Sequence, residues 1–296
     1  GSLDLVTTIP AGPGQFLLYV EGNSTPRKNG VASLLGEANG DAGTALDKDG
    51  DGRLQVSELH YTQGFAAGEI TLGLLDVTGF LDTNAVANDE TTQFLGASFV
   101  LNPVIEFPDY TLGGAYHQEL GEDTSLSLVL TSSHGLGDNP DRSYSELFDV
   151  NDDGKGVFAA VEGGFPLAGA QVGVGAWLSS ADHDRLDGTA TDEDNYGVYS
   201  NIDFAVGEAM VNVRLGWADD SVSQGSTFIG VATEMPTSLA PLGLAIGRIG
   251  LADDAEAPGV DDITQAEAYL RFALNDQLQL TPSVQWISNT GFDSSD

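Results

Sequence analysis

The chain has 296 residues, with 45 acidic side chains, 10 basic ones and no cysteine, so its formal net charge at pH 7 is −35. This charge argues against nucleic-acid binding, which needs Lys and Arg to neutralise phosphates, and the lack of cysteine excludes disulfides, thiolate metal sites and a cysteine nucleophile. A hydrophobic content of 41% is ample for a folded chain, and 38 glycines favour an all-β protein with many tight turns.

Strands are predicted along most of the chain, because apolar and polar residues alternate with a period of two. In 211–217, for example, Val211, Val213 and Leu215 alternate with Asn212 and Arg214. No apolar run is long enough for a transmembrane helix, and we expect no signal peptide. About 14 strands are expected, the first two being weak: 15–21, 31–35, 54–63, 69–77, 109–118, 125–131, 156–164, 169–179, 196–206, 211–217, 226–234, 241–251, 266–274 and 278–286. A change of phase near Arg248 predicts a β-bulge there.

The predicted connections are alternately short and long, so all long connections of an antiparallel meander lie at one end. Of the 45 acidic residues, 32 lie in these long connections, which crowds negative charge at one rim. Together with the polar faces, this pattern predicts an antiparallel transmembrane β-barrel, a single domain over residues 1–296. Fourteen strands are visible, and 16 are expected in the complete barrel because the parity leaves both ends on the outer side. A soluble β-sandwich or jelly roll with acidic loops is the alternative fold.

Several separated blocks resemble the carbohydrate-selective porins of Gram-negative outer membranes, in the order in which that family has them. They are Glu58-Leu-His-Tyr-Thr-Gln63, Gly73-Leu-Leu-Asp76, the segment from Gly79 to Leu95, Asn102-Pro-Val-Ile-Glu-Phe-Pro108, and the closing region from Glu267 to Gly291. The chain departs from the family pattern at Leu74, where a lysine is usual, and has few arginines on the polar face. The resemblance implies an outer-membrane porin that passes sugars or other small polar solutes by passive diffusion.

The sharpest local motif is a 12-residue calcium-loop pattern beginning at Asp47. Carboxylates occupy positions 1, 3 and 5, glycine occupies position 6, a carbonyl is offered at position 7 and a glutamate stands at position 12, as Ca²⁺ requires. These residues are Asp47, Asp49, Asp51, Gly52, Arg53 and Glu58. A weaker copy, with Asp149, Asn151 and Asp153, lacks the final glutamate because position 12 is Ala160, and Glu162 is the candidate substitute for it. The alternative for both is a solvated acidic loop without metal.

The long connection at 78–108 is expected to fold inward and narrow the lumen, as the porin resemblance implies. Polar and charged side chains of this connection and of the facing strands are candidates for lining the constriction and meeting a hydroxyl-rich solute: Asp82, Asn84, Asn88, Glu90, Asp203, Arg214, Glu267 and Arg271. Arg248 is a further candidate for this lining, and Tyr199 or Tyr269 could pack on a sugar face. The competing interpretation is a structural network in which the arginines pair with carboxylates and bind no solute.

Enzymatic activity is not expected, because the four histidines show no metal-ligand spacing and no nucleophile or phosphate-loop motif is present. The expected partners are outer-membrane lipid and a small polar solute, with Ca²⁺ at the outer loops, and a monomer or a homo-oligomer is equally compatible with the sequence. A soluble secreted calcium-binding β protein, acting as a surface-layer or binding module, is the second hypothesis. A sugar-acting enzyme on a β scaffold is the third, since carboxylates abound.

Overall fold

A computed structural model describes residues 1–30, 35, 38–40, 44–139, 141–151, 155–255 and 262–289. It contains sixteen strands: β1 (Ser2–Ala11), β2 (Gly14–Asn23), β3 (Leu54–Phe65), β4 (Gly68–Leu75), β5 (Thr111–Gly121), β6 (Thr124–Ser132), β7 (Val157–Leu167), β8 (Ala170–His183), β9 (Glu193–Val206), β10 (Ala209–Ala218), β11 (Gly225–Met235), β12 (Leu242–Leu251), β13 (Ile263–Leu270), β14 (Phe272–Asn275), β15 (Leu278–Leu280) and β16 (Ser283–Ser288). The helical pieces are the single turns η2 (Val77–Gly79), α2 (Ala97–Val100), η3 (Glu146–Phe148) and η4 (Asp253–Ala255). Within the described ranges, no helix is long and apolar enough to cross a membrane.

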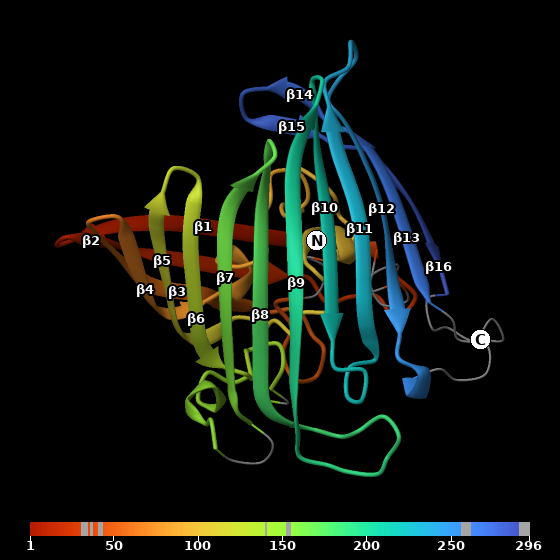
Figure 1. Ribbon diagram of the computed structural model, residues 1–296. Coiled ribbons are helices and arrows are strands. Elements are labelled where there is room, and N and C mark those ends of the chain that lie inside the picture. Colours follow the sequence, from red (N-terminus) through yellow and green to blue (C-terminus); the bar gives the residue numbers. More distant parts are fainter. Residues whose placement is uncertain are drawn as a thin grey trace.

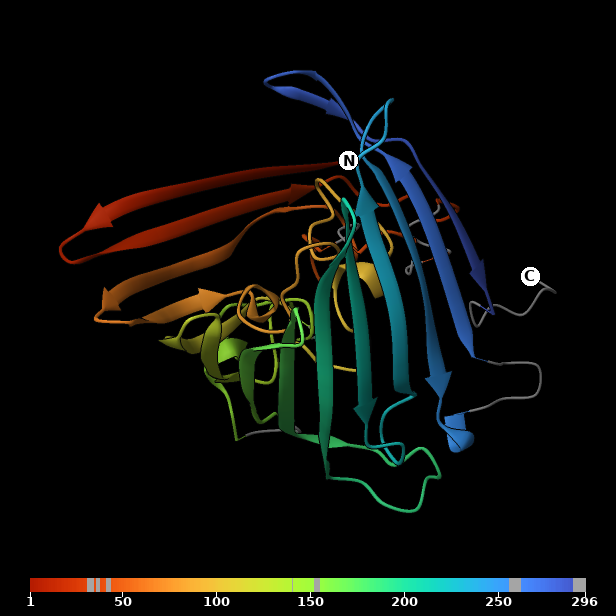
Figure 2. The same ribbon diagram turned by 45° about the horizontal axis from the view of Figure 1, so that its top comes forward.

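Fourteen of these strands form one antiparallel sheet in which each strand pairs with its neighbours in sequence, from β1 to β13, with β16 next to β13. β14 and β15 form a separate two-stranded sheet. The large sheet curves around a segment of its own chain (Figures 1 and 2). β1 and β16 are its two edge strands. The predicted class, an all-β antiparallel meander, is therefore present.

From β1 to β10 the connections are alternately short and long, as the sequence predicts, whereas the connections before and after β11, 219–224 and 236–241, have six residues each. The turns that join β7 to β8 and β9 to β10 have two residues each, and both residues of the first, Ala168 and Gly169, have positive φ (+53° and +89°). Such turns match the right-handed twist of a hairpin. The short turns between β5 and β12 lie at the upper end in Figure 1 and the long connections at the lower end.

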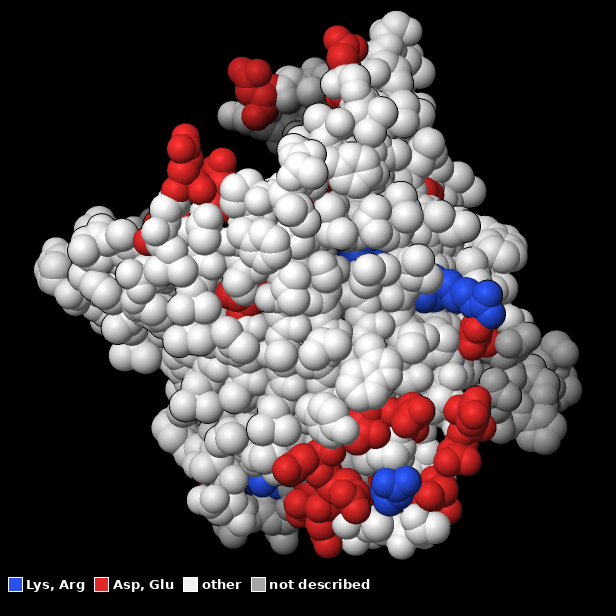
Figure 3. All heavy atoms as spheres, in the orientation of Figure 1, with Lys and Arg blue, Asp and Glu red and all other residues white. Residues whose placement is uncertain are grey.

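The two faces of the sheet are arranged in the opposite way to those of a soluble protein. On β10, Asn212 and Arg214 point to the concave inner face and are each 2% exposed, while Leu215 and Trp217 point outward and are 38% and 40% exposed. The same alternation of largely polar inward and apolar outward side chains occurs along β6, β9 and β13. In Figure 3 the outer wall forms a belt with few charges, and acidic side chains gather on the long connections below it. An apolar outer band around a polar interior is typical of a barrel that spans a membrane.

The structure differs from the sequence prediction at both ends of the sheet. β1 was not predicted, and the weak strand expected at 31–35 lies, apart from Leu35, outside the described residues. The two last predicted strands are interrupted, giving β13–β14 and β15–β16. Pro282 lies at the second interruption and has no backbone N–H to donate, which explains why the ladder stops there.

The bulge predicted near Arg248 is wrong. The register between β12 and β13 runs without a shift from Leu242 to Ile249, and the irregularity between β11 and β12 lies at Gly225–Thr227 instead. Arg248 keeps the outward phase of Leu244 and Ile246, and it forms an ion pair with Asp262 at the rim of the sheet. Its long side chain can follow the wall toward water, so a charge is tolerated on this face.

Candidate functional site

The connection between β4 and β5, residues 76–110, lies against the inner face of the sheet and is called the infolded segment below. Its apolar side chains pack on inward-facing residues of the strands in two clusters. Leu81 and Val104 belong to a cluster with Phe158 of β7 and Trp177 of β8. Phe94 packs edge-on against Tyr269 of β13, with 4.9 Å between ring centroids. This burial accounts for the inward path of the segment.

Four carboxylates of the strands accept hydrogen bonds from backbone N–H groups of the infolded segment. Glu58 of β3 accepts from Asp76 (3.2 Å), and Glu162 of β7 accepts from Asp82 (2.7 Å). Asp203 of β9 accepts from Ala85 (3.0 Å). Glu267 of β13 accepts from Leu95 and, at 2.8 Å, from Gly96. A charged acceptor makes a stronger hydrogen bond than a neutral one, so these four carboxylates anchor successive parts of the segment to the wall.

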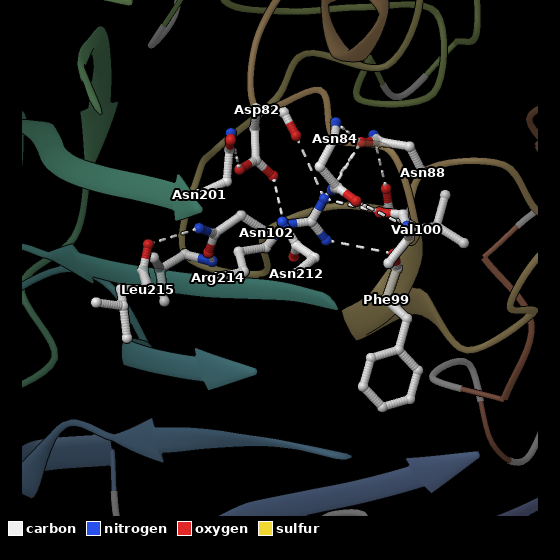
Figure 4. A network of polar contacts seen from close by, with 12 residues as sticks. Asp82, Asn84, Asn88, Phe99, Val100, Asn102, Asn201, Asn212, Arg214 and Leu215 are labelled. Carbon is white, nitrogen blue, oxygen red and sulfur yellow. Dashed lines mark hydrogen bonds and ion pairs between the residues drawn. The ribbon is translucent and has the colours of Figure 1, made fainter. Parts of the chain in front are cut away.

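Arg214 of β10 also binds the infolded segment, but as a positively charged hydrogen-bond donor (Figure 4). Its Nε lies 2.9 Å from the Asp82 carboxylate, and its guanidinium also donates to the carbonyl oxygens of Phe99, Asp82 and Ala87. Arg271, which follows β13, donates to the Thr92 carbonyl (2.7 Å) and pairs with Glu234. Both arginines are therefore engaged by the protein itself.

The remaining candidates from the sequence hold the segment together or line its surface. Asn84 accepts from the N–H groups of Val86 and Ala87, and the amide group of Asn88 donates to the Val100 carbonyl. Glu90 lines a cavity of about 410 Å³ beside the end of β4 and the start of β5. We call this cavity the mouth hollow. Tyr199 and Tyr269, considered as platforms for a sugar, are 3% and 1% exposed, so their faces are covered by protein.

Two further residues hold the infolded segment in a role that the sequence did not predict. Glu162, predicted only as a substitute ligand of the second calcium loop, instead faces inward on β7 and accepts a hydrogen bond from Asp82. The alternation along β7 was the available signal for its inward position. Glu106 lies near the end of the infolded segment and accepts hydrogen bonds from Ser179 and His183 of β8 and from Asn195 of β9. It belongs to the Asn102–Pro108 block that resembles the porin family, but the resemblance implied no role for it.

The predicted calcium loop is formed only in part. Asp47 Oδ1 accepts from the N–H groups of Asp49 and Asp51, at 2.9 Å each, which closes a tight acidic turn just before Arg53 and β3. Glu58, the expected twelfth position, lies on β3 and bonds to Asp76 instead. Among the described residues, no three His, Asp or Glu side chains are close enough to hold a metal ion. In this arrangement the residues therefore do not fit a completed Ca²⁺ site.

Of the second loop, Asp149 lies 3.6 Å from the Lys155 ammonium, Asn151 lies on the exposed surface, and Asp153 is outside the described residues. The mouth has one further pair of acids, Asp109 and Asp138. Asp138 accepts from the backbone N–H groups of Asp109 and Gly135. Burial and, to a smaller extent, the neighbouring Asp138 carboxylate raise the pKa of Asp109 to about 7. Negative charge is thus concentrated at this end of the molecule.

A sequential antiparallel meander with an apolar outer wall, a polar inner wall and a segment folded inside it defines the outer-membrane β-barrels of the porin class. The model of the carbohydrate-selective porin family, OprB, matches residues 18–296, and the chain belongs to that family. This membership confirms the resemblance seen in the sequence and places the chain in the outer membrane of a Gram-negative bacterium.

Solved porins share the fold at low sequence identity. The high-pH structure of OprB from Pseudomonas putida superposes with a TM-score of 0.66 at 13% identity, covering 94% of this chain and 79% of that one. A loop-deletion variant of OmpT from Vibrio cholerae gives 0.54 at 13%, covering 97% and 84%. An uncharacterized protein of Aquifex aeolicus (strain VF5) is 35% identical over 80 residues, which is 27% of this chain and 26% of that protein.

Proposed function

We propose that the chain forms a passive diffusion channel for sugars or other small polar solutes. The observation that carries the proposal is the inverted wall, with Asn212 and Arg214 inside and Leu215 and Trp217 outside, closed in part by an anchored inner segment. A polar interior can be wet, and a segment fixed inside it would narrow the passage. Family membership supports the same reading.

A solute would meet the surface of the infolded segment and not the buried arginines. Arg214 is 2% exposed, so it cannot touch a passing molecule. The mouth hollow, by contrast, presents hydroxyl and carboxylate groups of Thr44, Thr78, Asp89 and Glu90, and its 410 Å³ is within the roughly 300–1,000 Å³ typical of small-molecule sites. Donors and acceptors of this kind can exchange hydrogen bonds with the hydroxyls of a sugar.

Conductance in a planar bilayer and liposome swelling with sugars of increasing size test this function. The refolded chain should give stepwise conductance and should swell liposomes faster with monosaccharides than with larger oligosaccharides. Arg248→Ala, which changes only the outer wall, is the matched control and should behave like the unaltered chain. Folded protein that inserts into the bilayer but gives neither conductance nor swelling would contradict the proposal.

The soluble alternative requires a polar outer surface. Leu130, Val198, Ile246 and Trp286 are instead 51–60% exposed on the outward face. Contact with lipid removes this apolar surface from water, so we propose lipid as the partner of the outer wall. Solubility without detergent is the quick discriminating measurement, because the membrane protein should aggregate there.

We propose secondly that Ca²⁺ binds the acidic turn that begins at Asp47. The sequence spacing supports this proposal. The turn at Asp47–Asp51 supports it as well, because it places the carboxylates of Asp47, Asp49 and Asp51 in one tight surface loop. Binding would require Glu58 to leave the Asp76 amide. The melting temperature should rise on adding Ca²⁺ and fall with a chelator, and Asp49→Asn should reduce the response more than Asp149→Asn. A melting temperature that Ca²⁺ and chelator leave unchanged would refute this site.

A further inference from the structure

The two arginines that contact the infolded segment are both paired with carboxylates of the protein. All ten Lys and Arg residues of the chain lie in its described part. Two of them donate to the infolded segment: Arg214 pairs with Asp82 at 2.9 Å, and Arg271 pairs with Glu234 at 2.6 Å. Each of these cations thus has a carboxylate partner, and Arg214 is also covered by protein. A passing anion would find little uncompensated positive charge here.

The surfaces left open on the inner side carry the opposite charge. The mouth hollow is lined by the carboxylates of Asp76, Asp89, Glu90 and Asp109. A second cavity of about 560 Å³, the turn-end hollow, lies at the short-turn end and is lined by Glu119 and Asp123, together with the neutral Ser125 and Gln171. Neither hollow has a Lys or Arg in its lining. Arg142, whose charge reaches Asp109, stands outside the mouth hollow.

We propose that the passage selects by charge: it admits cationic and neutral solutes and holds back anions. This inference rests on the proposed diffusion function. Carboxylates in hollows with low-dielectric walls create a negative potential that raises the local concentration of cations. The Debye length is about 10 Å at 0.1 M salt and about 3 Å at 1 M, so this potential acts across a hollow of molecular size in dilute salt and is screened in concentrated salt.

The test is the reversal potential of the refolded full-length chain in a planar bilayer with a KCl gradient. The unaltered chain should show a reversal potential of the cation-selective sign at low ionic strength, and the value should shrink toward zero in concentrated salt. At pH 8, where Asp109 is mostly ionised even though its pKa is raised to about 7, Glu90→Gln and Asp109→Asn in the mouth hollow, and Glu119→Gln in the turn-end hollow, should each shift the reversal potential toward zero. The triple variant should show the largest shift.

Two matched controls remove one charge outside the hollows: Asp254→Asn on η4 at the rim, and Glu208→Gln in the short turn between β9 and β10, both exposed. They should leave the reversal potential unchanged. A channel that is non-selective or anion-selective overturns the inference while leaving the diffusion function intact. Controls that shift the potential as much as the hollow variants also overturn it, because the charge would then act from the rim. An absence of conductance would instead count against the proposed function.

Discussion

The Nε atom of Arg214 lies 2.9 Å from Oδ2 of Asp82, and the two side chains are 3% and 2% exposed. One residue belongs to strand β10 and the other to the infolded segment, 132 positions earlier in the chain. A buried ion pair gains little over a well-packed apolar contact, but removing one partner leaves a costly unpaired charge. The pair therefore acts mainly as a positional device that fixes the segment to one strand.

Replacing Arg214 by alanine should both destabilise the protein and loosen the infolded segment. The isolated Asp82 carboxylate should lower the free energy of unfolding by about 3–5 kcal/mol, and the widened passage should raise single-channel conductance and its noise. Urea unfolding and bilayer recordings measure the two effects. Arg248→Ala breaks an exposed pair on the outer wall and should cost only about 0–1 kcal/mol. If both variants behave alike, Arg214 does not anchor the segment.

Glycine on the inner face makes room for aromatic rings. Gly243 of β12 lies directly across from Tyr269 of β13, and a Cβ at Gly243 would overlap the ring. Gly243→Ala should therefore force Tyr269 to move and cost about 1–3 kcal/mol of stability. Gly163→Ala in β7 meets no atom within 4 Å and should be neutral or slightly stabilising. Thermal unfolding of the two variants in the same detergent measures both effects. Equal melting temperatures would contradict the expected difference.

The buried acid at the mouth makes stability depend on pH. Because the pKa of Asp109 is raised to about 7, the folded state holds a proton that the unfolded chain releases between about pH 4 and pH 7. The stability contribution of this group thus falls as pH rises through that window. Asp109→Asn removes the penalty, so it should stabilise the protein at pH 8 by at least about 1 kcal/mol and have no such effect at pH 4.

Melting curves of Asp109→Asn and of the unaltered chain at the two pH values provide the measurement. Asp254→Asn, at an exposed acid on η4, is the control and should show the same small difference at both pH values. The charges that act on Asp109 come from Asp138, Asp76, Glu21 and Arg142, so the variant must be compared at constant ionic strength. A gain at pH 4 as large as that at pH 8 would exclude titration of Asp109 as the cause.

Most strands could be predicted because one face of the sheet is polar and the other apolar, which imposes an alternation of polar and apolar residues over seven or more positions. The exceptions have local physical reasons. β1 has both faces exposed, with Leu3, Leu5, Val6 and Ile9 all more than 50% exposed, so no regular alternation marks it. Near Arg248 the apolar residues change face, from Ile246 outside to Ile249 in the inner cluster, but the register stays continuous because Arg248 itself occupies the outward position between them. A change of face along the sequence therefore did not require an extra residue in the strand.

The inner residues were predictable in position but not in role. Alternation alone places Asp203, Arg214 and Glu267 on the inner face. Their partners could not be predicted, because they are backbone groups of a segment more than 100 positions away whose path depends on tertiary packing. Charged groups predicted to meet a solute bind the infolded segment instead, as in the structural-network interpretation. The calcium pattern was limited in the same way, because Glu58 lies on β3 and accepts a hydrogen bond from Asp76.

The orientation of the wall gives the most direct test of membrane insertion. Ile246 lies near the middle of β12, points outward and is 55% exposed, so a lysine there would have to enter the lipid. Ile246→Lys should cost about 2–4 kcal/mol when the protein is unfolded by urea from lipid vesicles. Gln171→Lys, on the inner face at the turn-end hollow, introduces the same charge into water and should change stability by less than about 1 kcal/mol. The reverse order of costs would mean that water reaches the outer face and is excluded from the inner one, because a charge is costly only on a face that water does not reach.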